Sequence, residues 1–393
     1  MNQPFIEIDY FQTHKAQQHV PGDAFLSKRL KDEQRIVSVL SDGLGSGVKA
    51  NVLSTLTATM ALNYASNNFD IRKTAHVIMK TLPVCSTRKI SYSTFSIVDI
   101  DAAGHAKVIE YDNPSFMLIR NGKLTELPKE TIELDTPNKS RNILKFSEFD
   151  CQLGDRLVLI SDGVSQSGMG TPQFPLGWGE PAVGDFVCRN IVENSDISAR
   201  DLARRIVQRA LTHDKNRAND DITCGIFNIR QPRELMVVSG PPIAQKKDPE
   251  LARIVQQFEG NKIICGGTTA NIVAREWNQK IEVNLKDFSR EVPPTSRMNG
   301  VDLITEGTIT LAKVIEILER DKFHEPTTAN GAEQLVSAML NSDIIHFVVG
   351  TKINDAHQDP NVPVELEIRR NIFKHIIRIM EEKHLKSTTL QFI

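Results

Sequence analysis

The sequence predicts an α+β protein with two domains. In the first half, short β-type runs separated by turn residues accompany helix-type segments, which indicates antiparallel strands with helices packed on them. From about residue 235 onward, apolar runs alternate with helix-type segments, a pattern typical of a separate α/β domain. We therefore predict a first domain over 1–231 and a smaller α/β domain over 235–393.

The composition fits a globular protein and argues against several classes of function. The chain has 393 residues, of which 40% are hydrophobic, enough for more than one core. A net charge of -2 gives no basic field, so we expect no nucleic-acid partner. Five cysteines without C-x-x-C spacing argue against a disulfide framework or a zinc site. With no leader-like or membrane-spanning apolar run, we expect a cytoplasmic protein that does not bind a membrane.

The first elements place an aspartate at the start of a strand. Residues 5–11 alternate apolar and polar side chains, as a half-buried strand does. The following Pro21-Gly22 pair predicts a turn that sets Asp23 at the head of a second strand. Because aspartate is common in turns, Asp23 taken alone favours a structural role.

A second aspartate ends the apolar run that begins at Val37. Asp42 is followed by alternating glycines, and Gly43 lets its own carbonyl approach whatever Asp42 holds, since no Cβ stands in the way. A metal ion is the natural candidate. A dinucleotide fingerprint fails because Val48 stands where the third glycine belongs, and the spacing also fails for a phosphate P-loop. An ordinary strand-to-helix turn stays open as an alternative.

Two helices and a β-rich region follow. Apolar spacing predicts an amphipathic helix over 49–64 with its apolar face on Val52, Leu53, Leu56, Met60 and Tyr64. A second helix over 71–82 would stop at Pro83, and we expect both helices on one face of a sheet. The next strands form an antiparallel meander with a hairpin turn at Asn121-Gly122. Its predicted strands are 92–99, 106–111, 115–120 and 123–127.

Further aspartates lie at strand ends later in the first half. The run 156–163 repeats the earlier device, since an apolar strand ends in Ser161-Asp162-Gly163. A helix pattern over 200–212 is followed by Asp220 and Asp221, which head a closing strand. Separate strands that meet at one sheet edge could thus gather several carboxylates.

Such a gathering of carboxylates points to divalent cations. Mg²⁺ and Mn²⁺ prefer oxygen ligands and commonly use more than one carboxylate. Like charges held so close repel unless a cation compensates them. Two ions that share a carboxylate would clamp a phosphate and lower the pKa of a bridging water. The pattern favours metal-assisted hydrolysis of a phosphate ester.

Taken in order, these motifs resemble a known family. Gly22-Asp23, the string Ser41 to Gly47, Ser161-Asp162-Gly163 and Asp220-Asp221-Ile222-Thr223 resemble the metal-dependent PPM serine/threonine phosphatases, and within them the bacterial SpoIIE-like branch. The resemblance covers about residues 5–230. It implies a PPM-type αββα sandwich, in which two antiparallel sheets are flanked by helices.

The resemblance also implies roles for the site residues. Asp42 would be shared by two Mn²⁺ or Mg²⁺ ions, and the Gly43 carbonyl would bind one of them. Asp162 and Asp220 would complete the shell of the second ion. Asp23 would bind metal or orient the attacking water.

Other positions are less determined by the resemblance. Asp221 matches a position that the family fills variably, so we place it below Asp220 as a ligand. The helix from Gly47 onward would correspond to a regulatory switch element. We find no counterpart to the phosphate-gripping arginine of eukaryotic relatives. Lys15 or His19 could approach the substrate, although a solvated surface position is favoured for each.

The second half offers one further candidate site. Gly266, Gly267, Thr268 and Thr269 follow a predicted strand and open a helix, an arrangement that suits an anion. Thr305 to Thr308 could lie beside them at the carboxyl edge of a parallel sheet. Helix capping by threonine is the alternative. Cys265 fits a small buried hydrophobe better than a nucleophile.

We therefore predict a metal-dependent protein phosphatase that acts on phosphoserine or phosphothreonine in bacterial signalling. By family analogy, its phosphorylated protein partner could be an anti-sigma-factor antagonist, and a homodimer stays open. The alternative is a phosphatase-like binding module whose C-terminal domain senses a small anion. A small-molecule phosphatase is a third hypothesis, which would need a closed pocket.

Overall fold

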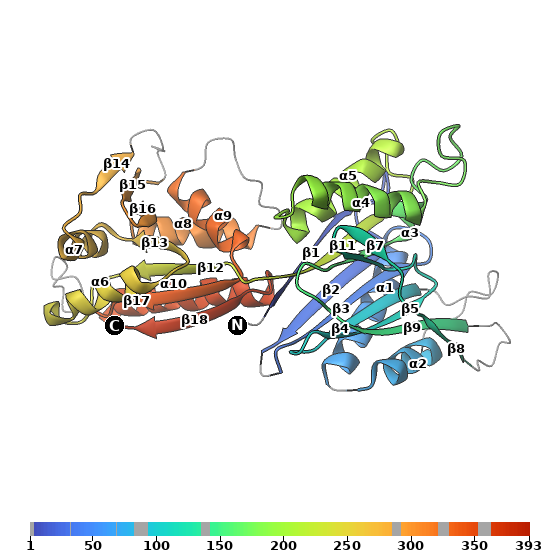
Figure 1. Cartoon of the computed structure of the whole chain (residues 1–393), viewed down its shortest axis with the longest axis horizontal. Coiled ribbons are helices and arrows are strands. Elements are labelled where there is room, and N and C mark those ends of the chain that lie inside the picture. The colour runs from blue at the N-terminus through green and yellow to red at the C-terminus, as the bar shows by residue number, and fades with distance from the viewer. Residues whose placement is uncertain are drawn as a thin grey trace. The chain divides into compact units, whose positions relative to one another are not determined.

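A computed structural model describes residues 4–31, 33–67, 69–81, 93–134, 142–284, 292–320, 330–352 and 363–393. The chain divides into two compact units, Met1–Gln231 and Pro232–Ile393, which are described separately (Figure 1). Among the described residues, no helix is both long and apolar enough to cross a bilayer.

The first unit contains two sheets in which every strand pair is antiparallel. One sheet has the order β1 (Phe5–Thr13), β11 (Ile222–Arg230), β10 (Arg156–Ile160), β6 (Met117–Arg120), β7 (Lys123–Thr125). The other has the order β2 (Asp23–Leu30), β3 (Arg35–Gly43), β4 (Ser93–Ile100), β5 (His105–Tyr111), β9 (Asn142–Asp150), β8 (Glu130–Leu134).

The two sheets pack face to face near β2 and β11. The ring of Phe25 on β2 stacks on Tyr10 of β1, with a centroid distance of 4.9 Å. The same ring packs against Gly225 on β11, where an added Cβ would lie only 2.3 Å from the nearest atom of the Phe25 ring. A glycine on β11 therefore makes room for an aromatic ring from the opposite sheet.

A pair of helices covers the outer face of each sheet (Figure 1). Helices α1 (Val48–Ser66) and α2 (Ile71–Thr81) share a core with the β2–β3–β4 sheet. Helices α4 (Glu180–Glu193) and α5 (Ala199–His213) share another with the β1–β11–β10 sheet, beside the short α3 (Asp162–Ser165). The predicted αββα sandwich is confirmed.

The predicted apolar face of α1 is wrong. Val52 and Leu56 are 57% and 48% exposed, whereas the buried face consists of small residues such as Ala58 and Ala61. Small side chains let the helix axis come close to the sheet, so the core at this point needs no large residue from α1. Pro83, the expected end of α2, lies outside the described residues.

The predicted meander is also wrong, because its strands belong to two sheets. β4 and β5 lie in one sheet, and β6 and β7 in the other. The chain crosses between them at residues 112–114, where Asp112 has a φ of 56° and Pro114 lacks a backbone donor. The hairpin at Asn121-Gly122 is confirmed, with both residues at positive φ.

The second unit has a seven-stranded mixed sheet. Its order is β14 (Glu282–Asn284), β15 (Thr295–Met298), β16 (Val301–Thr305), β13 (Asn261–Cys265), β12 (Glu234–Ser239), β17 (Ile344–Val349), β18 (Ser387–Phe392). The five strands from β16 to β18 in this order run parallel to one another. Strand β15 pairs antiparallel with β16 on one side and with β14 on the other.

Helices cover both faces of this sheet. Side chains of β12 alternate, so that Leu235 and Val237 enter one core while Met236 and Val238 enter another. Helices α8 (Thr308–Glu319), α9 (Gly331–Asn341) and α10 (Pro363–Glu382) pack on the first face. Helices α6 (Asp248–Gln257) and α7 (Gly267–Trp277) pack on the second, after the short η1 (Gln245–Lys247). The second unit thus has the predicted α/β architecture.

Candidate active site

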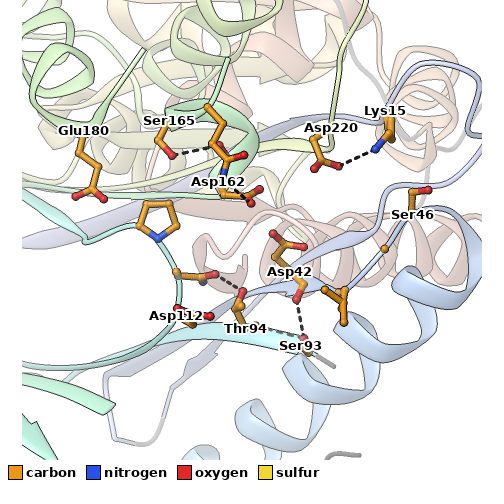
Figure 2. Close-up of a pocket in the computed structure, with 16 residues that line it drawn as sticks. Lys15, Asp42, Ser46, Ser93, Thr94, Asp112, Asp162, Ser165, Glu180 and Asp220 are labelled. Carbon is orange, nitrogen blue, oxygen red and sulfur yellow. Dashed lines mark hydrogen bonds and ion pairs between the residues drawn. The ribbon is translucent and has the colours of Figure 1, made fainter. Parts of the chain in front are cut away.

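A cavity of about 830 Å³ in the first unit is lined by carboxylates from separate segments (Figure 2). Asp42 comes from the end of β3, Asp162 follows β10, and Asp220 precedes β11. Gly43 and Lys15 also line this cavity. The structure therefore brings together three of the five predicted aspartates on one surface.

Strand pairing places Asp23 next to this group. Asp23 and Asp42 are direct cross-strand partners at the ends of β2 and β3. Asp23 is only 2% exposed and lies behind the cavity instead of lining it. Its Oδ2 accepts a hydrogen bond of 2.6 Å from the Thr223 hydroxyl, which links β2 to β11 in the opposite sheet.

Asp221 has a different position from Asp220. It is 4% exposed, and its Oδ1 accepts the backbone N–H of Lys15 at 3.0 Å. Asp220 instead has a side chain that is 44% exposed, with Oδ1 3.6 Å from the ammonium of Lys15. Asp221 thus anchors the segment before β2, whereas Asp220 presents its carboxylate to the cavity.

Burial and mutual repulsion raise the pKa values of Asp23, Asp42 and Asp162. Burial, more than any other cause, raises the pKa of Asp23 to about 8, although the hydroxyls of Thr223 and Ser161 oppose this shift. The pKa of Asp42 is raised well above its usual range by burial and then by neighbouring carboxylates, Asp23 first. Burial and the charge of Asp220 raise the pKa of Asp162. Among the described residues that line the cavity, Lys15 is the one Lys or Arg side chain, and it lies beside Asp220, so the carboxylates outnumber the positive charges.

The residues fit a divalent cation by their donor chemistry. Several carboxylates face one cavity, and the charge of Asp162 is among the causes that raise the pKa of Asp42. In the described ranges, no group of three or more His, Cys, Asp or Glu side chains is arranged so that it could already hold a metal ion. The aspartates line the walls of the cavity, where oxygen ligands for Mg²⁺ or Mn²⁺ are expected.

The glycine after each aspartate has a packing role. A Cβ at Gly43 would lie 2.1 Å from the carbonyl oxygen of Ala50 in α1. A Cβ at Gly163 would lie 2.1 Å from the carbonyl oxygen of Asp221. In each Ser-Asp-Gly motif, glycine therefore admits a neighbouring segment of the site.

Asp214 was not predicted, although it joins two loops of the site. Its carboxylate accepts the N–H of Gly168 at 2.7 Å and that of Asn219 at 2.9 Å. It also accepts the Asn219 side-chain amide at 3.0 Å. The loop after Asp162 is thereby fixed to the loop before Asp220. In the sequence, an aspartate directly after a helix pattern gives no signal beyond an ordinary cap.

Lys15 and several polar residues complete the cavity wall. Lys15 lines the cavity, whereas His19 is not among its lining residues. The sequence also gave no signal for Glu180, which comes from the start of α4, or for Ser93, whose hydroxyl donates to the Asp42 carbonyl at 2.9 Å. These residues come from strand and helix starts without a motif of their own.

The second candidate site lies at the carboxyl edge of the parallel sheet. Gly266 precedes α7, and its N–H donates to the Thr305 carbonyl at 2.9 Å, so the two predicted loops do lie side by side. Thr268 is exposed and Thr269 is buried. Burial raises the pKa of Cys265 to about 12, which is unfavourable for a nucleophile.

Two facing antiparallel sheets, an outer helix pair on each, and a cavity of aspartates at strand ends match the fold expected of the PPM class. The family model described as stage II sporulation protein E (SpoIIE) matches residues 32–230. The chain therefore belongs to the SpoIIE family.

Solved structures show similar domains. The SpoIIE phosphatase domain of Bacillus subtilis is 16% identical to this chain, with a TM-score of 0.43. The match covers 59% of this chain and 95% of the Bacillus subtilis domain. The RsbU and RsbW domains of a Mycobacterium tuberculosis protein are 17% identical, with 65% and 68% covered and a TM-score of 0.47. The serine/threonine phosphatase PstP of Mycobacterium tuberculosis is 14% identical, with 57% and 99% covered and a TM-score of 0.39. The comparison with curated proteins found no match. Membership of the family is shown by the match of residues 32–230 to the SpoIIE family model.

Proposed function

We propose that the first unit is a Mn²⁺- or Mg²⁺-dependent protein phosphatase that hydrolyses phosphoserine or phosphothreonine. The observation that supports it most is the cavity wall to which Asp42, Asp162 and Asp220 all contribute. Burial and neighbouring carboxylates raise the pKa values of Asp42 and Asp162. Such a wall favours bound cations, because a cation removes the repulsion between ionised carboxylates.

The residues take the following roles in this proposal. Asp42, Asp162 and Asp220 would hold the ions, and the carbonyl of Gly43 would be a further oxygen ligand. When bound, the ions supply positive charge and Lewis acidity for phosphate ester hydrolysis. Asp23, held by the Thr223 hydroxyl, binds metal or orients water from behind the cavity.

Residues around the aspartates position them and meet the substrate. The amide of Gln166 donates to Asp162 Oδ2 at 3.0 Å and so fixes the orientation of that carboxylate. Lys15 is the cation in the described cavity wall, and its side chain is 36% exposed. We assign it to a phosphate oxygen of the substrate, since an ammonium at the rim attracts an incoming dianion.

The substrate in this proposal is a phosphorylated protein in a signalling pathway, with an anti-sigma-factor antagonist as the family analogue. The exposed side chains of Lys15 and Asp220 put the cavity rim within reach of a protein loop. A homodimer is compatible with the proposal.

Turnover of p-nitrophenyl phosphate with added Mn²⁺ tests the proposal. We expect Asp42→Asn and Asp162→Asn to lower kcat/KM by at least about a hundredfold, because even partners of metal ligands commonly contribute 10- to 100-fold. Lys15→Met should raise KM more than it lowers kcat. The control is Asp150→Asn, whose side chain is 85% exposed on β9 and pairs with His105.

Folded wild-type protein that turns over neither p-nitrophenyl phosphate nor a phosphoserine peptide with Mn²⁺ or Mg²⁺ would refute the enzyme and favour the binding-module alternative. Turnover of p-nitrophenyl phosphate without the peptide would favour a small-molecule substrate. Circular dichroism of each variant shows whether it is folded.

A further inference from the structure

The carboxyl edge of the second sheet is rich in glycine. Four neighbouring parallel strands, β16, β13, β12 and β17, are each followed within two residues by a glycine. These are Gly307, Gly266, Gly240 and Gly350. A Cβ at Gly307 would lie 3.6 Å from the Cα of Gly266, so the turns that begin α7 and α8 abut.

The two helices that begin at these turns carry the same feature. The third residue of α7 is Thr269 and the third of α8 is Thr310, and they are 1% and 0% exposed. Neither hydroxyl has a hydrogen-bond partner among the residues that the structure describes. Buried hydroxyls are normally paired, so two unpaired ones at adjoining helix starts call for an explanation.

The N-terminus of α7 is open, whereas that of α8 is capped. In α8, Glu306 Oε2 accepts the N–H of Ile309 at 3.1 Å. In α7, the N-cap Gly266 has no side chain to accept a bond, and the first turn contains no acidic residue. The first helical residue, Gly267, is exposed, and a Cβ added there would meet no atom within 4 Å. Within the described part of the second unit, no side chain of the N-cap residue caps this turn, so its amides can meet an external acceptor.

Two further observations favour a negatively charged acceptor. The Thr269 hydroxyl points to the Gly266 turn, with Oγ1 3.6 Å from where a Cβ of Gly266 would be. Arg369 lies at the same edge, where Nη1 donates to the Gly350 carbonyl at 3.2 Å and lies 2.5 Å from the Cβ position of Gly240. The positive end of a helix and a guanidinium both attract anions.

We propose that the second unit binds the phosphate group of a small molecule at the N-terminus of α7. The amides of Gly267, Thr268 and Thr269 hold the phosphate oxygens, and the Thr269 hydroxyl gains the partner that it lacks. Ligands of open α/β sheets bind at the carboxyl ends of the parallel strands, where this turn lies. The proposal concerns the second unit alone and stands whether or not the first unit is a phosphatase.

The test uses the full chain in EDTA, so that divalent cations in the first unit contribute no affinity for phosphate. Inorganic phosphate and AMP are titrated by calorimetry and by thermal unfolding. We expect both probes to bind wild type and to raise its melting temperature. Gly267→Asp should weaken binding at least about tenfold, because it places a carboxylate beside the anion. Its Cβ meets no atom, and an acidic residue suits a helix start, so this variant should fold.

Matched variants separate the site from general effects. Thr269→Val removes the hydroxyl and keeps the shape, so it should weaken binding with little change in the unliganded melting temperature. Thr74→Val is the control, since Thr74 is 1% exposed with an equally unpaired hydroxyl on α2 of the first unit. Binding of AMP without inorganic phosphate would assign the site to an esterified phosphate. No binding by wild type, or equal binding by Gly267→Asp, would overturn the proposal.

Discussion

Asp23 and Asp42 face each other on neighbouring strands, and this pairing has a consequence for the metal-free protein. Asp23 has a pKa raised from 3.8 to about 8, mainly by burial. A carboxyl with a raised pKa binds its proton more tightly in the folded state than in the unfolded state. The contribution of this carboxyl to the free energy of unfolding is therefore complete below pH 3.8, and it is lost as the pH rises through about 8.

We therefore expect the free energy of unfolding of the metal-free protein to fall between pH 4 and pH 8. Mn²⁺ should reduce the fall, because it favours the ionised carboxylates. Urea unfolding in EDTA at a series of pH values measures the slope, and Asp23→Asn, which does not titrate, should make it smaller. Identical slopes for wild type and Asp23→Asn would show that the burial of Asp23 does not control this dependence.

At the scale of elements, the site depends on loops held together from outside the cavity. Asp214, at the end of α5, receives three N–H groups from the loops that carry Asp162 and Asp220. It is 7% exposed and does not line the cavity. Asp214 is thus a positioning residue, whose effect on the reaction passes through the two carboxylates.

Asp214→Ala leaves three N–H groups without their acceptor, so we expect a loss of ~2–4 kcal/mol in unfolding free energy. The Mn²⁺ concentration for half-maximal activity should rise about tenfold. Asp214→Asn keeps one acceptor oxygen and should lie between wild type and alanine in both measurements. Asp150→Ala, at an exposed position, should stay within about 0.5 kcal/mol of wild type. If Asp214→Ala lowered the free energy of unfolding but left the Mn²⁺ concentration for half-maximal activity unchanged, Asp214 would have a purely structural role.

Sequence patterns predicted those elements whose local signal agrees with their place in the fold. Strands that end in aspartate were found because apolar runs and turn residues mark them directly. Helix α4 was missed, since its buried face includes Gly184 and Asn190 and so lacks a clear apolar period. Other missed elements were α6, α9, β8, β9, β14, β15 and β18.

The meander failed for a different reason. The local pattern of 92–127 predicts hairpins, but it contains nothing that assigns each hairpin to a sheet, because that choice depends on distant strands. β6 pairs with β10, and β5 pairs with β9, both far along the chain. The same limit applies to Asp214, whose partners are specified only by the tertiary structure. Motif spacing was enough for the cavity aspartates because strand ends converge on one edge.

At the scale of the whole molecule, the two units have separate cores. Among the described residues, the core clusters divide cleanly: those of the first unit contain residues up to 231, and those of the second contain residues beyond it. Phe227 on β11 and Phe373 on α10 are each 0% exposed. A chain with independent cores is expected to unfold in more than one step.

Calorimetric unfolding of Phe227→Ala and Phe373→Ala tests this independence. Each substitution should cost about 3–5 kcal/mol in its own unit. We expect two transitions in wild type, with Phe227→Ala lowering the one that Mn²⁺ stabilises and Phe373→Ala lowering the other. A single transition that both variants shift equally would mean that the two units unfold as one.

The central claim is that Asp42, Asp162 and Asp220 bind divalent cations in one cavity. The most direct measurement is anomalous X-ray diffraction from crystals of the full chain soaked in Mn²⁺, with Asp42→Asn crystals as the comparison. We predict two manganese peaks in the cavity of wild type, both within bonding distance of Asp42, and their loss or weakening in Asp42→Asn. An empty cavity at saturating Mn²⁺, or peaks only elsewhere, would contradict the claim.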